Sequence, residues 1–199
     1  MQDLQSQWAG GRDIWPAVPN GDHTISLTTR VKRVGDNDET NIFPWPQVLK
    51  NKILYGFGAY NPRGIVETDD YNNKHHEMLK ADIIEGLIRA FPQVGVTLWW
   101  EAASLWEDGT SERGFIVAFE CDTLLNQDAG ENWSISLAEK YQQGAIYEFK
   151  YESDPTDPSK GKMHRRTIAV LDSGTDADVE IILASLLHDK ASNENLPEK

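Results

Sequence analysis

The sequence predicts an α+β fold in which an antiparallel sheet carries two helices on one face. Three observations lead to this fold class. Four segments between residues 52 and 152 have the apolar and aromatic composition of strands. Apolar residues at helical spacing separate the first of these segments from the second, and a shorter helical segment separates the third from the fourth.

The first fifty residues are expected to form an arm and a strand that pack on this core. Tryptophans and prolines with glycines between them, in residues 1–21, are suited to an extended arm held by aromatic anchors. Residues 23–34, "HTISLTTRVKRV", alternate apolar and polar side chains and predict a strand. The segment "IFPWPQVLKN" contains two prolines and predicts an irregular connection.

The first half of the core begins with the strand "ILYGFGAY", which Asn61-Pro62 ends. Apolar residues at helical spacing predict an amphipathic helix over residues 73–91, stopped by Pro92. The segment "VGVTLWWEA" is the second predicted strand. Asp108-Gly109 indicates a hairpin turn into the third strand, "GFIVAFEC".

The second half of the core begins with residues 122–132, a polar stretch that we expect to be a small insertion. Capping residues predict that a short helix, "SISLAEKYQQ", starts near Asn132 or Ser136 and ends at Gly144. The segment "AIYEFKYE" is the fourth strand. The order over residues 51–152 is therefore β-α-β-β-α-β, the split βαβ or ferredoxin-like arrangement.

Residues 153–190 are expected to extend this core by a strand and a helix. The segment "SDPTDPSKGK" predicts a turn, and "MHRRTIAVL" predicts a strand. The segment "DADVEIILASLLHDK" places apolar residues on one helical face. Residues 191–199 are expected to be a flexible tail.

The composition bounds the protein class. A chain of 199 residues with 39% hydrophobic residues can bury one sizeable core. Its apolar stretches are too short to cross a bilayer, and no signal peptide is visible, so we expect a cytoplasmic protein without membrane contact. Cys121 is the single cysteine, which excludes internal disulfides and multi-cysteine metal sites. We expect no metal and no cofactor.

The formal net charge of -13 is concentrated in the second half of the chain. Residues 1–100 carry -2 and residues 101–199 carry -11. Such a surface repels phosphate backbones, so direct nucleic-acid binding is disfavoured. Mimicry of nucleic acid, with this surface occupying the basic site of another protein, is one hypothesis; plain solubility is the alternative.

Signatures of catalysis are largely absent, because the chain has no Walker loop, HExxH, GxSxG or GxGxxG after a strand. His75 and His76 are adjacent and cannot hold one metal from one helix face, so we expect them to be a polar helix start. The run His164-Arg165-Arg166 predicts a solvated strand face, with an anion contact as the alternative.

Four polar residues are expected to meet at one edge of the sheet. Strand 1 runs antiparallel to strands 3 and 4, so its end at Asn61 lies beside their starts near Glu112 and Gln143, and beside the helix start near Asn72. Asn61 is expected in an extended conformation before Pro62, and Asn72 as a helix cap. The group can be a small-ligand site, with Tyr60 or Tyr141 for stacking, or a buried structural network.

Motifs in the same span resemble a known family. They are Tyr60-Asn61-Pro62, Asn72 with Leu79, Glu112 with Phe115, and the segment 141–146, "YQQGAI". In this order they resemble the bacterial domain of unknown function DUF3293, over roughly residues 52–150. Residues 122–132 are longer than the family's link, and the flanking segments have no counterpart in it. The resemblance implies the fold span and the polar residues, and it implies no chemistry.

The leading functional hypothesis is a binding domain for a small polar ligand or a protein partner, acting through Asn61, Asn72, Glu112 and Gln143 or through the acidic surface. The runner-up is an enzyme for a small polar or nucleotide-like substrate, with Glu112 as acid or base and the amides as orienting groups.

Overall fold

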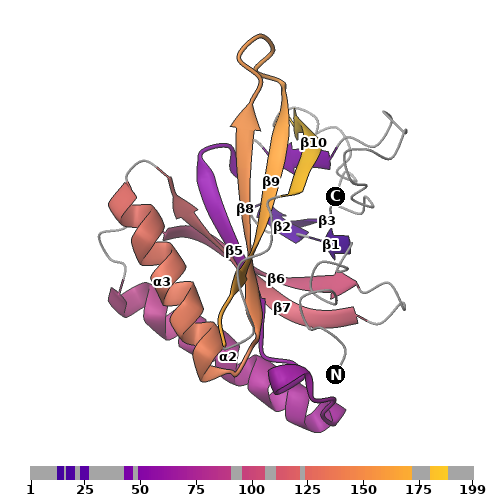
Figure 1. The fold of residues 1–199 in the computed structure, drawn as a ribbon, viewed down its shortest axis with the longest axis vertical. Helices are drawn as coiled ribbons and strands as arrows, with labels where there is room; N and C mark the ends of the chain where they lie inside the picture. The colour runs from indigo at the N-terminus through magenta and orange to yellow at the C-terminus, as the bar shows by residue number, and fades with distance from the viewer. Residues whose placement is uncertain are drawn as a thin grey trace.

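The computed structural model describes residues 13–15, 17–20, 23–26, 43–46, 49–90, 96–105, 111–121, 124–171 and 180–187. At its centre is a five-stranded antiparallel sheet in the order β6-β7-β5-β8-β9, extended by β1 beyond β6 and by β10 and β4 beyond β9 (Figure 1). The fold is therefore α+β. The strands are β1 (Asp13–Trp15), β4 (Phe43–Pro46), β5 (Lys52–Gly58), β6 (Val96–Leu105), β7 (Ser111–Glu120), β8 (Ala145–Ser153), β9 (Lys160–Ala169) and β10 (Glu180–Leu187).

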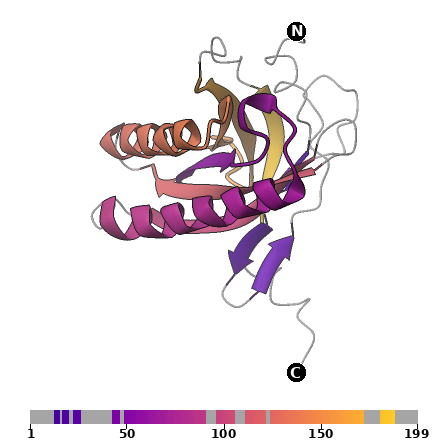
Figure 2. The ribbon, with the colours of Figure 1, turned by 90° about the horizontal axis from the view of Figure 1, so that it is seen from below.

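Two long helices, α2 (Asp69–Ala90) and α3 (Leu124–Lys140), lie side by side on one face of this sheet (Figure 2). Helix α2 buries a stripe with helical spacing that begins with two polar residues, Asn72 and His76, and continues with Leu79 and Ile83. Against the helices pack the strand residues of the same face, which are Ile53, Tyr55, Phe57, Phe115, Val117, Phe119, Ile146 and Ile168.

The opposite face of the sheet is also buried in the described residues. Successive strand residues point to opposite faces, so Leu54 and Ile116 point away from the helices, and both are 2% exposed. Trp45, from β4, stacks on Tyr151 of β8 with a ring separation of 5.7 Å. Strand β5 is therefore covered on both sides, which explains its nearly continuous apolar sequence.

The predicted C-terminal helix is wrong. Residues Glu180–Leu187 form β10, which pairs antiparallel with β9 and parallel with β4. An unbroken apolar run fits both a helix face and a strand that is buried between two neighbours, so periodicity alone did not separate them. The eight-stranded order also goes beyond the four strands of the predicted core.

The predicted insertion at residues 122–132 is wrong as well, because α3 begins at Leu124 and includes most of this stretch. Gly130 lies inside the helix at a place where a Cβ atom would be 2.9 Å from Cγ of Phe119. Gly130 is therefore a point where the helix approaches the sheet closely.

The first fifty residues contain more strands than predicted. The segment Phe43–Pro46, expected to be irregular, is β4, and as the last strand of the sheet it tolerates proline. β2 (Ala17–Asn20) pairs with β3 (His23–Ser26), while residues 27–34 of the predicted strand lie outside the described residues. The predicted turn at Asp108-Gly109, the Pro92 stop and the tail at 191–199 also lie outside them.

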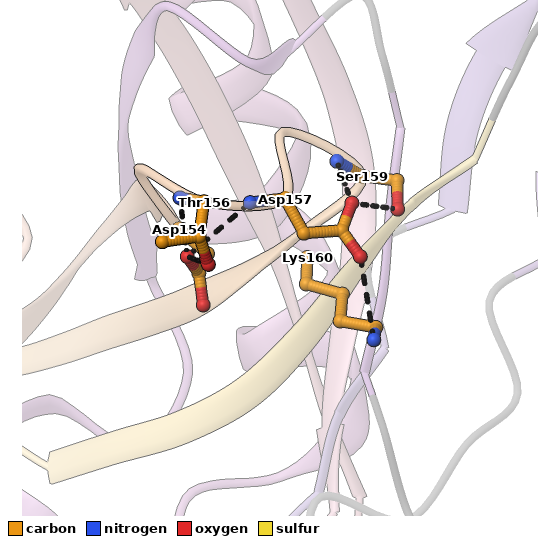
Figure 3. A network of polar contacts seen from close by, with 5 residues as sticks. All are labelled: Asp154, Thr156, Asp157, Ser159 and Lys160. Atoms are coloured by element: carbon orange, nitrogen blue, oxygen red, sulfur yellow. Dashed lines mark hydrogen bonds and ion pairs between the residues drawn. The ribbon is translucent and has the colours of Figure 1, made fainter.

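The predicted turn between β8 and β9 is confirmed and repeats one motif twice (Figure 3). Asp154 Oδ1 accepts hydrogen bonds from the backbone N–H and the hydroxyl of Thr156, at 2.7 and 2.6 Å. Asp157 Oδ1 does the same with Ser159, at 3.1 and 2.6 Å. These bonds hold the pKa of each aspartate below its usual value.

Two helical glycines that face aromatic rings give a test of this packing. Gly130→Ala would press on Phe119, which is fully buried and cannot move aside. We expect a net loss of about 1–2 kcal/mol in unfolding free energy, after the gain in helix propensity. Gly86→Ala faces the partly exposed Trp133 ring at 2.9 Å, so it should cost less or stabilise.

Urea unfolding of the two variants measures this difference. Equal effects of Gly130→Ala and Gly86→Ala would contradict the close contact between α3 and the sheet.

Candidate functional site

The chain turns sharply at Asn61, just after the end of β5. Asn61 has φ 47° and ψ 61°, in the left-handed region, and Arg63 and Gly64 also have positive φ. The extended conformation predicted for a residue before proline is therefore wrong here. Asparagine enters the left-handed region at a lower cost than most residues, and its side chain makes the bonds that hold it there.

Asn61 uses its backbone and its side chain together. Its N–H donates to Oδ1 of Asn72 at 3.0 Å, and its own Oδ1 accepts from Nδ2 of Asn72 at 3.0 Å. The same Oδ1 accepts from the N–H of Glu67 at 3.1 Å. Nδ2 of Asn61 donates to Oε1 of Glu112 at 2.9 Å. One side chain thereby joins the loop, α2 and β7.

Asn72 is not the helix cap that the sequence predicts. It is the fourth residue of α2, and it is 5% exposed. The cap is Thr68, whose hydroxyl accepts a hydrogen bond from the N–H of Tyr71 at 3.3 Å. Because Asn72 lies on the buried stripe of α2, its carboxamide is directed into the network with Asn61.

Gln143 reaches the same edge from the end of α3. Its Nε2 donates to the carbonyl of Tyr60 at 2.9 Å. The helix ends with Gln142 in the left-handed conformation, φ 55°, and with the N–H of Gln143 bonded to the carbonyl of Ala138. Gly144, predicted to end the helix, is therefore not the residue at the left-handed position.

The four polar residues predicted to meet at one edge do meet there. We call Asn61, Asn72, Glu112 and Gln143 the edge network. Asn61, Asn72 and Glu112 bond to one another, and Gln143 bonds to the backbone beside Asn61. Asn72 is buried and the other three are partly exposed. These bonds are those of a structural network, and a ligand role for the four residues stays a prediction.

The two tyrosines expected to stack on a ligand are placed differently. Tyr60 is partly exposed, and its hydroxyl donates to Oδ1 of Asn73 at 3.0 Å. Tyr141 is 6% exposed, and its hydroxyl donates to Oδ2 of Asp82 at 2.5 Å. Burial, followed by this hydrogen bond, raises the pKa of Tyr141. The ring of Tyr141 belongs to the core between the helices and has little surface for stacking.

His76, which we expected at a polar helix start, is fully buried. Its ring stacks on Phe115 with a separation of 4.5 Å, and its Nε2 lies 3.3 Å from Oε1 of Glu101. Glu101 in turn accepts a hydrogen bond from Nε of Arg113 at 2.7 Å. Burial, followed by the positive charge of Arg113, lowers the pKa of His76. The helical spacing of His76 to Leu79 and Ile83 indicates that His76 lies on the buried face of α2, and this spacing was not used to predict its burial.

The basic run on β9 is not a solvated face. Arg165 is 5% exposed and lies over the ring of Tyr147. Arg166 donates to Glu131 of α3 at 2.6 Å and to Glu148 of β8 at 2.9 Å. These bonds connect the second helix to the sheet, so the run has a structural use.

The described ranges contain neither a cluster of metal ligands nor a membrane-spanning helix. No three side chains of His, Cys, Asp or Glu in these ranges lie close enough together to hold a metal ion. None of the helices described there has the length and apolar composition needed to cross a bilayer.

The edge network predicts a clear difference between two neighbouring asparagines. Asn72→Ala removes both hydrogen bonds between Asn72 and Asn61, so the backbone N–H of Asn61 loses its acceptor. We therefore expect a loss of about 1–3 kcal/mol in unfolding free energy. The exposed neighbour Asn73 is the control, and Asn73→Ala should change stability by less than about 0.5 kcal/mol. Chemical denaturation measures both; similar losses would contradict the network.

His76 predicts a loss of stability in mild acid. Its pKa is below 6.5 in the folded protein and near 6.5 in the unfolded chain, so the unfolded chain binds more protons as the pH falls below about 6.5. The contribution of His76 is therefore present at pH 7.5 and is lost progressively in acid. Thermal melts at pH 7.5 and pH 5.5 should show a smaller shift in His76→Phe than in the wild type. Equal shifts in His76→Phe and in the wild type would contradict this role of His76.

Comparison with known proteins found no similarity that bears on this site. No family model matches the chain, and no curated protein and no solved structure matches it. The resemblance to DUF3293 stays a prediction.

Proposed function

We propose that the protein is a binding domain that recognises a protein partner through the loop formed by residues 61–67, which we call the contact loop. One observation carries this proposal. Ile65 is 58% exposed and Val66 is 86% exposed, side by side on a loop that the edge network holds in place. The polar residues then support a contact surface, and the apolar pair makes the contact.

The contact loop is fixed along its length. The N–H of Gly64 bonds to the carbonyl of Asn61 at 2.9 Å, and the N–H of Arg63 bonds to the carbonyl of Gln142 at 2.8 Å. The N–H of Ile65 bonds to the carbonyl of Pro62 at 3.0 Å. Positive φ angles at several residues are costly and persist where surrounding bonds determine them. Such bonds favour a loop with one shape.

A loop of one shape is suited to binding. Burying an isoleucine or a valine side chain in a partner stabilises a complex by about 1.5–3 kcal/mol each. A loop that is already ordered loses little conformational entropy on binding, so more of this energy remains as affinity. The partly exposed Tyr60 and the exposed Asn73 beside the loop would supply the polar rim of such an interface.

The other hypotheses gain less from the geometry. Glu112, the acid or base of the enzyme hypothesis, has one carboxylate oxygen bonded to Asn61. Acids of the second half bond within the chain at several separate places, as Glu101 does with Arg113 and Glu131 with Arg166. Nucleic-acid mimicry would use acids aligned on one face, and these bonds do not favour it.

Two finer assignments belong to the same proposal. We propose that β5 to β8 is a ferredoxin-like unit related to DUF3293, supported by the strand order β6-β7-β5-β8 and by a helix within each βαβ half. A cytoplasmic location is proposed on the basis of composition and of the single cysteine.

The contact loop is tested by the double variant Ile65→Ser/Val66→Ser in the full chain. Proteins cross-linked to the wild type in an extract of the source cells are identified by quantitative mass spectrometry, and the affinity of a purified candidate is then measured by calorimetry. We expect the loop variant to bind at least tenfold more weakly, because two apolar contacts are lost.

The matched control is Met78→Ser/Ile84→Ser, which removes two side chains of α2 that are 44% and 40% exposed. It should retain the partner. If no protein is lost selectively from the loop variant while its thermal melt is unchanged, the contact loop is not the binding surface.

A further inference from the structure

A cavity of about 360 Å³ lies at the other end of β5 from the contact loop. Its walls are Lys50, Asn51, Lys52, Glu120, Cys121, Lys150 and Tyr151. Its volume is within the range of small-molecule sites, about 300–1,000 Å³. It is independent of the contact loop, from which it is separated by the length of β5.

The topology of the sheet explains why the cavity is there. β5 pairs with β7 from Lys52 onward, whereas its pairing with β8 begins one residue later, between Ile53 and Lys150. β8 continues past this point to Ser153, paired with β9. The start of β5 and the outward-running β8 thus leave a space that the turn at Lys50 and Asn51 borders.

The charge of the walls is opposite to the charge of the protein. Three lysines and one glutamate line the cavity, in a chain whose formal net charge is -13. Nζ of Lys52 lies 2.5 Å from Oε1 of Glu120, so this pair is neutralised within the wall. Glu120 therefore offsets the charge of Lys52 only. The other two lysines of the lining, Lys50 and Lys150, carry a formal charge of about +2.

Burial accounts for the pairing of one of the three lysines. Lys52 is 9% exposed, and burying an ammonium group is unfavourable unless it is paired. Glu120 accounts for that lysine alone. Lys50 and Lys150 line the same cavity, so an anion bound there would meet two further positive charges.

The geometry points to a binding site for a small anion that carries a phosphate group, either free phosphate or a phosphate monoester. Lysine ammonium groups are compact charges that suit the tetrahedral oxygens of phosphate. Asn51 offers a carboxamide for a further polar contact, and Tyr151 supplies an aromatic wall for an organic part.

The single cysteine makes this proposal measurable without knowledge of the natural ligand. Cys121 lines the cavity, is partly exposed and is the only thiol in the chain. Its alkylation by iodoacetate, an anion, or by iodoacetamide, which is neutral, can be followed by mass spectrometry of the intact protein. Lysines near the thiol should accelerate the anionic reagent more than the neutral one.

Lys150→Glu is the test variant, because Lys150 is exposed and its replacement should leave the fold intact. We expect the ratio of iodoacetate to iodoacetamide rates to fall at least threefold. Inorganic phosphate and glycerol 3-phosphate are the binding probes, titrated by calorimetry at low ionic strength. The affinity of the tighter probe should fall at least tenfold in this variant, and each probe that binds should protect Cys121 from alkylation in the wild type.

Lys162→Glu is the matched control, since it makes the same change in net charge at an exposed residue that does not line the cavity. It should keep the wild-type rate ratio and affinity. Binding of both probes indicates recognition of the phosphate group alone, and binding of glycerol 3-phosphate alone indicates a site for a monoester. No binding of either probe at 10 mM, or equal losses in Lys150→Glu and Lys162→Glu, overturns the proposal.

Discussion

The left-handed backbone at Asn61 is the constraint on which this end of the fold depends. The residue before a proline is pushed away from helical conformations, so the turn would be unfavourable if left to the local sequence. Four hydrogen bonds of Asn61 with Asn72, Glu67 and Glu112 offset this cost. They also determine where α2 begins relative to β5. The polar side chain of Asn61 therefore holds the start of α2 in a fixed place relative to β5. The apolar residues of α2 pack against the sheet from that place.

The central strand β5 explains why the flanking segments belong to the same fold. Its helix-facing side is covered by α2 and α3, and its other side would be open in a sheet with helices on one face only. Trp45, Leu49 and Trp100 are each at most 5% exposed, and the first two precede β5 in the chain. Trp45, which precedes β5, thus contributes to a second layer of the core through its contact with Tyr151.

Much of this fold could be predicted from the sequence. The core strands and the first helix have apolar residues at the spacing of their structure, and the β8–β9 segment has turn residues. The meeting of Asn61, Asn72, Glu112 and Gln143 followed from strand directions alone. Roles were harder to predict than positions. Tertiary packing buries the charged side chain of Arg165, and the burial of His76 was missed although its helical spacing to Leu79 and Ile83 indicated it. β10 was predicted as a helix because the spacing of its apolar residues does not reveal that it lies between two strands of the sheet.

The two ends of β5 differ in their chemistry, and the difference bears on how each could act. At the Asn61 end the polar groups of the edge network are bonded to one another, and two of the exposed side chains, Ile65 and Val66, are apolar. At the Lys52 end the walls are cationic within an acidic chain. Charges in water are screened beyond about 10 Å at ordinary ionic strength. An anion in the cavity would therefore be repelled only weakly by the net charge of the whole protein and attracted strongly by the lysines that it contacts. A compact, doubly charged ligand gains most from such short-range attraction, whereas a long polyanion would extend into the acidic surface and lose it.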